Sequence, residues 1–208
     1  VGTPVVFESD QTEWISATFD SDSNKVVIVY KDAANSGYGT AVVGTVSGTS
    51  ISYGAAVVFE SADTREISAT FDSNSNKVVI AYSDWGNSDY GTGIVGTVSG
   101  TSISFGTAVV FETATVAYTS AIFDSNENKV VISYQDSGNS GHGTAIVGTV
   151  SGTAISFGTA VVFEAANSQH ISASFDSTAN KVVIAYKDLG NSNYGTGIVG
   201  TVSGTSIS

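Results

Sequence analysis

Four chemically different side chains occupy one equivalent position of an otherwise faithfully repeated sequence. They are Trp14, Glu66, Tyr118 and His170, and the residues just before them are Glu13, Arg65, Ala117 and Gln169. Aromatic rings stack on the C–H faces of sugars, while carboxylates, amides and guanidinium groups bond hydroxyls. Residues of these types indicate a surface that contacts a glycan or another protein.

A second segment of each repeat varies in the same way. It contains the equivalent residues Ala33, Trp85, Ser137 and Leu189, and Tyr38, Tyr90 and Tyr194 stand at its end in three of the four repeats. The candidate ligand-binding residues are therefore Glu13, Trp14, Tyr38, Arg65, Glu66, Trp85, Tyr90, Tyr118, His170 and Tyr194. The open alternative is that both segments are the longest loops and tolerate change without binding anything.

Acidic residues recur at fixed positions and suggest a cation. Asp20, Asp72, Asp124 and Asp176 end the same strand of each repeat, so four carboxylates could surround one mouth of a central channel. Such a ring would suit Ca²⁺ or another cation, and the repeated Asp32, Asn35 and Ser36 offer further oxygen ligands. The alternative is that each aspartate accepts hydrogen bonds from its own turn. No other cofactor is expected.

Catalytic motifs are weak in this sequence. Its two histidines, His142 and His170, each occur in one repeat, and no Ser–His–Asp arrangement can be defended from their spacing. A carboxylate pair of the kind that hydrolyses glycosides stays open, because Asp and Glu number 19. Catalysis needs one asymmetric site, whereas the repeats are nearly symmetric. The sequence therefore predicts a protein that is not an enzyme.

Charge and composition exclude several classes of partner. The 208 residues are 41% hydrophobic and carry a formal net charge of -12. An acidic surface repels phosphate backbones and anionic lipids, so nucleic acid and membrane insertion are not expected. The absence of cysteine excludes disulfides and thiolate metal sites.

The motif Phe-Asp-Ser recurs every 52 residues, at Phe19, Phe71, Phe123 and Phe175, so four repeats account for the whole chain. Each repeat predicts four strands, which in the first are residues 15–20, 25–30, 40–46 and 50–60. Short connections favour an antiparallel meander. The second strand, KVVIVY and its copies, is continuously apolar, which indicates burial on both faces.

Burial of both faces of the second strand favours a β-propeller, whose blades lie between neighbouring blades. An immunoglobulin-like domain needs about 100 residues, and a β-solenoid coil is usually shorter than this repeat. We therefore expect one all-β domain over residues 1–208, a β-propeller of four four-stranded antiparallel blades. The blades would span about 15–60, 67–112, 119–164, and 171–208 completed by 1–8. Closure of the ring through residues 1–8 is favoured, while two chains forming eight blades and a piece of a longer array are the open alternatives.

In a propeller, loops from strand 4 to strand 1 share a face with loops from strand 2 to strand 3. Both variable segments would then lie on one face, with residues 9–14, 61–66, 113–118 and 165–170 as six-residue loops. The opposite face would carry the nearly constant DSxxN and Ser-Gly turns. Clustered variation indicates diversification for contacts.

The order ISATFDSNSN, KVVIAYSD, YGTGIVGTV, SGTSISFG resembles the blade repeat of sialidase-like propellers that carry Asp boxes. The Asp-box turn that the resemblance implies should follow the third strand, but TVSGTSISFG holds no Asp there. A partial match, Asp84-Trp85-Gly86-Asn87-Ser88, lies one loop earlier. Sialidase activity in that family needs several arginines, and Arg65 is the single arginine here. The blade count also resembles hemopexin-like propellers, whose disulfide is missing.

These observations predict a lectin-like or adhesin-like module that binds a glycan or a protein surface through its variable face. The alternative from another class is a structural repeat of an extracellular fibre or surface protein, and a glycoside-acting enzyme is the third possibility. A secreted, cell-surface or virion-surface location is expected. The partners would be a glycan or a protein, with a homo-oligomer of two chains also possible.

Overall fold

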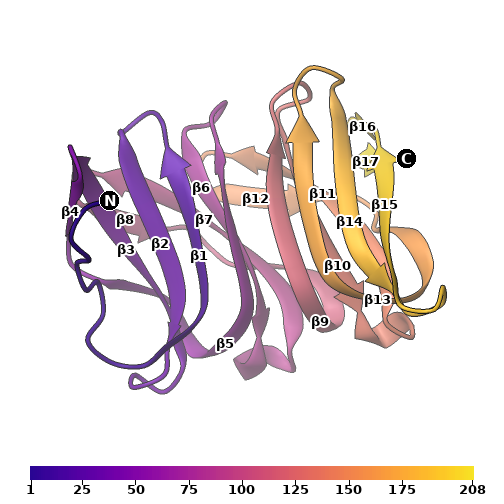
Figure 1. Ribbon diagram of the computed structural model, residues 1–208, viewed down its shortest axis with the longest axis horizontal. Helices are drawn as coiled ribbons and strands as arrows, with labels where there is room; N and C mark the ends of the chain where they lie inside the picture. The colour runs from indigo at the N-terminus through magenta and orange to yellow at the C-terminus, as the bar shows by residue number, and fades with distance from the viewer.

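The computed structural model describes all 208 residues and consists almost entirely of antiparallel strands (Figure 1). The strands are β1 Thr12–Asp20, β2 Lys25–Asp32, β3 Tyr38–Ser47, β4 Ser50–Tyr53, β5 Val57–Asp72, β6 Lys77–Asp84, β7 Tyr90–Ser99, β8 Ser102–Phe105, β9 Val109–Asp124, β10 Lys129–Asp136, β11 His142–Ser151, β12 Ala154–Phe157, β13 Val161–Asp176, β14 Lys181–Asp188, β15 Tyr194–Gly200, β16 Val202–Ser203 and β17 Ser206–Ile207. Short 3₁₀ turns, η1 Trp85–Asn87 and η2 Ser137–Asn139, follow β6 and β10. Neither is long or apolar enough to cross a membrane.

Each 52-residue repeat forms one unit, and units 1 to 3 share one topology, whereas β15 of unit 4 has no strand on its far edge. In unit 1, β1 pairs with β2 and β2 with β3, all antiparallel. The fourth strand is divided: β4 returns from a hairpin at Gly48, which has a φ of 60°, and the start of β5 pairs with the other end of β3. The strand predicted over 50–60 is thus two pieces separated near Gly54, where an added Cβ would collide with the Thr101 carbonyl of the next unit.

The predicted six-residue loops are wrong in three of the four repeats. Residues 61–66 belong to the 16-residue strand β5, which ends unit 1 and then begins unit 2. β9 and β13 connect the later units in the same manner. In the first repeat, β1 begins at Thr12, inside the predicted loop. The variable segment is therefore extended backbone interrupted by a β-bulge between Arg65 and Ser68 and at the equivalent positions.

The prediction that the second strands are buried on both faces is confirmed for β6 and β10. All residues of β6 after Lys77 are buried, and the same holds for β10 after Lys129. Three apolar clusters lie between consecutive units, and each combines valines and an alanine of one unit with valine, isoleucines and a tyrosine of the next. The fold is held together chiefly by these interfaces between units.

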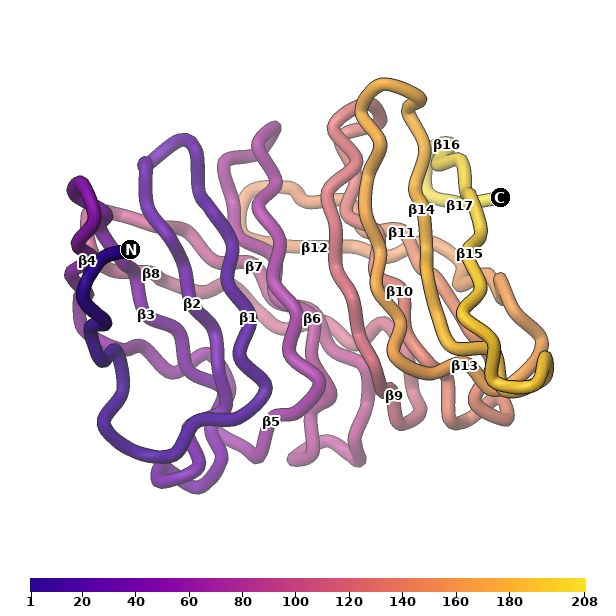
Figure 2. The backbone as a smooth tube through the Cα atoms, viewed as in Figure 1, coloured from indigo at the N-terminus to yellow at the C-terminus, as the bar shows by residue number.

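The units follow one another along an arc, and the N and C termini lie at its opposite ends (Figures 1 and 2). The strand order begins with β1 and ends with β15, and residues 1–8 form no strand with either. Instead, Phe7 packs edge-on against Tyr30 and Tyr53 of unit 1. The expected closure of the last unit by residues 1–8 is therefore not made in this structure.

Candidate binding site

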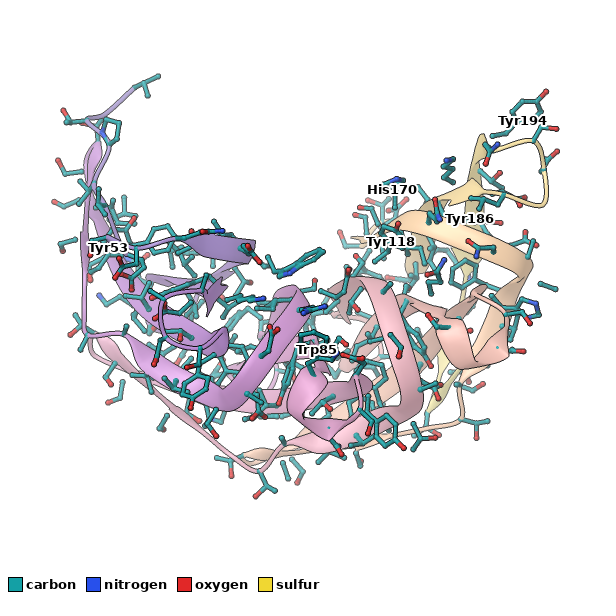
Figure 3. The ribbon with its side chains drawn as sticks, turned by 90° about the horizontal axis from the view of Figure 1, so that it is seen from below. Tyr53, Trp85, Tyr118, His170, Tyr186 and Tyr194 are labelled. Atoms are coloured by element: carbon teal, nitrogen blue, oxygen red, sulfur yellow. The ribbon has the colours of Figure 1, made fainter.

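The two variable segments of each repeat lie side by side, as the sequence predicted. The Ala33 amide donates to the Gln11 carbonyl at 3.0 Å, and Leu189 makes the same bond to Asn167 in the last unit. In Figure 3, Trp85 lies near the middle of the arc, Tyr118 and His170 lie close to each other, and Tyr194 lies at the C-terminal end. We call the surface formed by the two variable segments of all units the variable face. Its residues are those of the two variable segments, 9–14 and 32–38 in unit 1 and their equivalents.

The residue at the centre of each bulge adopts a left-handed backbone conformation. Trp14, Glu66, Tyr118 and His170 have φ values of 51°, 52°, 51° and 52°. This region costs a non-glycine residue on the order of 1 kcal/mol, and Gly or Asn are its usual occupants.

The opposite face provides the contrast. Its tight turns also contain a left-handed residue, and in all four repeats that residue is asparagine: Asn24, Asn76, Asn128 and Asn180. At the bulges of the variable face the same conformation carries a different large or charged side chain in every unit. Backbone geometry therefore does not explain which side chains occupy the bulges, and their contacts must.

In unit 2 the variable face carries a charged network beside an exposed indole. The Arg65 guanidinium carbon lies 3.4 Å from the centroid of a Trp85 ring, and the same guanidinium bonds Asp63 at 2.9 Å. Lys31 of unit 1 approaches Asp63 at 2.8 Å and Glu13 at 3.5 Å. Burial acts to raise the pKa of Asp63, but hydrogen bonds from Lys31 and Arg65 and their charges hold it below its usual value. Trp85 remains 49% exposed on this support.

Further along the arc, bulge residues of neighbouring units contact one another. Glu66 accepts a hydrogen bond of 2.6 Å from the Tyr118 amide, and the ring centroids of Tyr118 and His170 are 5.0 Å apart. Burial raises the pKa of Glu66, although the Tyr118 amide opposes the shift. Glu66, Tyr118 and His170 thus form a continuous row across three units.

The candidates differ in how far they reach solvent. Trp14, Trp85 and Tyr194 are 43%, 49% and 62% exposed, while Tyr38 and Tyr90 are half-buried at the start of β3 and β7. Some variable residues serve internal pairs instead: Gln135 donates to Asn167 at 2.9 Å, where the first unit boundary has Lys31 and Asp63. Part of the sequence variation therefore keeps paired residues of neighbouring units matched to each other.

The predicted carboxylate ring for a cation does not form. Asp20, Asp72, Asp124 and Asp176 each accept two backbone hydrogen bonds of 2.9–3.1 Å from their own turn. In the second candidate site, Asp32, Asp136 and Asp188 accept from the amides of Asn35, Asn139 and Asn191. No three His, Asp or Glu side chains gather in an arrangement that could hold a metal ion. These aspartates thus accept hydrogen bonds from their own turns, as the alternative interpretation of the sequence had it.

Sequence reasoning missed a repeated pair that joins the units. The phenols of Tyr30, Tyr82, Tyr134 and Tyr186 donate to Glu8, Glu60, Glu112 and Glu164 at 3.0–3.3 Å. Burial, followed by repulsion from Asp84 and Asp136, raises the pKa values of Glu60 and Glu112. The invariance of Tyr and Glu, 22 residues apart in every repeat, was the available signal.

A groove near the constant turns was also not predicted. It is open, has a volume of about 510 Å³, and is lined by the strand ends at residues 18–21, 70–73, 122–125 and 173–175. Phe19, Phe71, Phe123 and Phe175 contribute its rings, and Ser and Thr its polar atoms. Because every unit supplies nearly the same residues, this groove is uniform where the variable face is diverse.

No protein-family model and no curated protein matches the sequence. Among solved structures, the fold is similar to that of an exo-β-1,3-galactanase from Phanerochaete chrysosporium, determined with β-1,3-galactotriose. The TM-score is 0.58 at 11% sequence identity, with 99% of this chain and 55% of the galactanase chain covered. The chain thus spans about half of that protein. The likeness shows a propeller-like, all-β fold that resembles a glycoside hydrolase propeller.

Proposed function

We propose that this protein is a non-catalytic glycan-binding module that holds its ligand on the variable face. The observation that carries the proposal is the occupation of strained, left-handed bulges by Trp14, Glu66, Tyr118 and His170. Two partly exposed indoles, Trp14 and Trp85, supply stacking surfaces, and Arg65 and Asp63 supply hydrogen-bonding groups beside one of them. The fold shared with a galactanase determined with a galactotriose is in keeping with a sugar ligand.

A binding role is favoured over catalysis by the state of the nearby carboxylates. Glu60, Glu112 and Glu164 each accept from a tyrosine, Asp63 is ion-paired, and Glu66 accepts from a backbone amide. The raised pKa values of Glu60 and Glu112 would suit a general acid, but the same Tyr–Glu pair recurs in every unit. A feature that recurs at every unit is better explained by packing than by one catalytic centre.

The structural-module alternative is favoured by a different observation, the free edge of β15, which pairs with β14 and has no strand on its other side. The two roles are compatible, since weak sites at fixed spacing gain affinity when several are engaged together. An extracellular location, on a cell or virion surface, belongs to the same proposal.

Trp14 and Trp85 are the only two tryptophans, so selectively excited tryptophan fluorescence reports on this face alone. The test titrates the protein with an oligosaccharide series that includes β-1,3-galactotriose, and follows tryptophan emission and calorimetric heat. We expect a saturable response that Trp85→Ala or Trp14→Ala weakens at least about tenfold, roughly 1.4 kcal/mol.

The matched control is Asn74→Ala, an exposed change in a constant turn of the opposite face, which should leave binding intact. Absence of binding across a broad glycan array would reject the proposal in favour of a structural role. Turnover of chromogenic glycosides that is lost in Glu60→Gln or Glu112→Gln would reject its non-catalytic part.

A further inference from the structure

The three boundaries between units are built in the same way. At the first boundary, Val27 and Val43 of unit 1 pack with Ile80 and Tyr82 of unit 2, and Phe59 of the connecting strand joins them. A serine hydroxyl completes each boundary by accepting a hydrogen bond from a backbone amide of the next unit. Ser16 accepts from Ala69 at 3.1 Å, Ser68 from Ala121 at 3.0 Å and Ser120 from Ala173 at 3.0 Å.

The C-terminal end of the arc presents one half of a fourth such boundary. Val183 and Val199 are 37% and 60% exposed, whereas the equivalent valines of the earlier units are fully buried. β14 is accordingly buried on alternate residues only, in contrast to β6 and β10. Ser172, the fourth member of the serine series, is exposed and accepts no amide within the chain.

The N-terminal end presents the other half. Ile15 is 55% exposed, while its equivalents Ile67 and Ile171 are 7% exposed. Phe19 and Val46 are each 54% exposed at the same end. Apolar side chains are thus exposed at both ends of the arc, while Ile28 and Tyr30, the equivalents of Ile80 and Tyr82, are already buried beside Phe7.

The strand that β15 lacks is also present in the chain. In units 1 to 3, the strands β3, β7 and β11 pair with Val-Val-Phe-Glu segments at the start of β5, β9 and β13. Residues 5–8 have the identical sequence, and Phe7 and Glu8 fix them against Tyr30 as Phe59 and Glu60 are fixed against Tyr82. The segment lies on unit 1 with Val5 and Val6 exposed and no strand beside it.

We propose that two copies of this chain associate head to tail, the N-terminal end of each docking on the C-terminal end of the other. The register of the earlier units places Glu8 of one copy opposite Gly195 of its partner, Val6 opposite Thr196 and Val5 opposite Gly197. Ser172 then accepts from the partner's Ala17 amide. Figure 3 shows the four units as an open arc whose N-terminal and C-terminal ends are its two tips. Two arcs joined by two such contacts close a ring of eight units.

A second copy, rather than the chain's own N terminus, covers the free edge of β15. Closing a ring of four units within one chain would require all three internal boundaries to change angle. Pairing also removes the exposed edge of β15, which is otherwise open to aggregation. Each chain carries a formal charge of -12, so salt should strengthen the association by screening the repulsion.

Mass measurement by light scattering and native mass spectrometry tests the proposal. The expected mass is twice the 21.2 kDa of one chain, with Ile15→Asp and Val199→Asp each reduced to a single chain. The control Val110→Asp, at an exposed position inside the arc, should remain a dimer. An equimolar mixture of Ile15→Asp and Val199→Asp should form a heterodimer, since one intact contact remains.

Disulfide trapping distinguishes the occupants, because the chain has no cysteine of its own. The double variant Val6→Cys with Thr196→Cys should oxidise to a covalent dimer on a denaturing gel. A disulfide within one chain would overturn the proposal in favour of a closed four-unit ring. A single-chain mass for the unmodified protein at millimolar concentration and high salt would overturn it as well.

Discussion

The Tyr82 phenol of unit 2 donates a hydrogen bond of 3.2 Å to Glu60, on the strand that ends unit 1. The same pair recurs at every unit, so each boundary places a buried hydroxyl beside a carboxylate whose ionised form repels phenolate. Burial, then the hydrogen bond to Glu164 and repulsion from it, raises the pKa of Tyr186 to about 12. Burial, then repulsion from the paired glutamate, raises the pKa values of Tyr30, Tyr82 and Tyr134 further. The boundaries between units are therefore sensitive to high pH.

The first prediction is cooperative unfolding at alkaline pH. An unfolded tyrosine ionises near pH 10, whereas folded Tyr82 keeps its proton well above that, so the stabilisation is complete below about pH 10 and lost as pH rises. Through Tyr82 alone, the free energy of unfolding falls by up to about 1.4 kcal/mol per pH unit in this window. Urea unfolding between pH 8 and 11.5 measures the decline. Tyr82→Phe should be less stable at pH 8 but decline less steeply, and an unchanged slope would contradict this account.

The second prediction concerns the serine that links neighbouring units. Ser68→Ala leaves the Ala121 amide without its acceptor and should lower the free energy of unfolding by about 1–2 kcal/mol. Ser172→Ala, which removes the equivalent but unpartnered hydroxyl, is the matched control. Both are compared in the Val199→Asp background, so that association does not contribute. Equal effects of the two changes would show that the bond does not stabilise the boundary.

The third prediction tests the strain at the bulges. Because Trp14 has a φ of 51°, Trp14→Gly should be more stable than Trp14→Ala by about 1 kcal/mol. Inside an ordinary strand the order is the reverse, since glycine loses more backbone entropy. Denaturant unfolding of the two variants gives the sign directly. Both should lose glycan binding equally, because both lack the indole.

The fourth prediction separates the two roles of Arg65. Arg65→Gln removes the cation above Trp85 and one partner of Asp63, so Trp85 emission should change in a Trp14→Phe background. The loss in stability should be below about 1 kcal/mol, as is usual for exposed cation–π contacts. The lowered pKa of Asp63 makes its stabilisation present above about pH 4 and lost below it. Arg65→Gln should weaken that acid dependence, and emission identical to the parent would show that the contact is absent in solution.

Several features of the fold could be predicted because they are written in local patterns. Continuous apolar runs such as KVVIAY indicated strands buried on both faces, and β6 and β10 confirm this. The short turns predicted antiparallel pairing, which placed the two variable segments together. The bulges at Glu66 and its equivalents could not be predicted, since extended backbone with one left-handed residue has no distinctive sequence.

The sequence by itself determined the repeat, the strands and the variable positions, because periodicity and side-chain type act over a few residues. Only the tertiary structure decided that the variable segment is strand rather than loop, that Arg65 lies over Trp85, and that Glu66 reaches Tyr118. It also decided that the four units form an arc instead of a closed ring. The angle between units depends on how side chains interdigitate at each boundary, and identical strands can meet at more than one such angle.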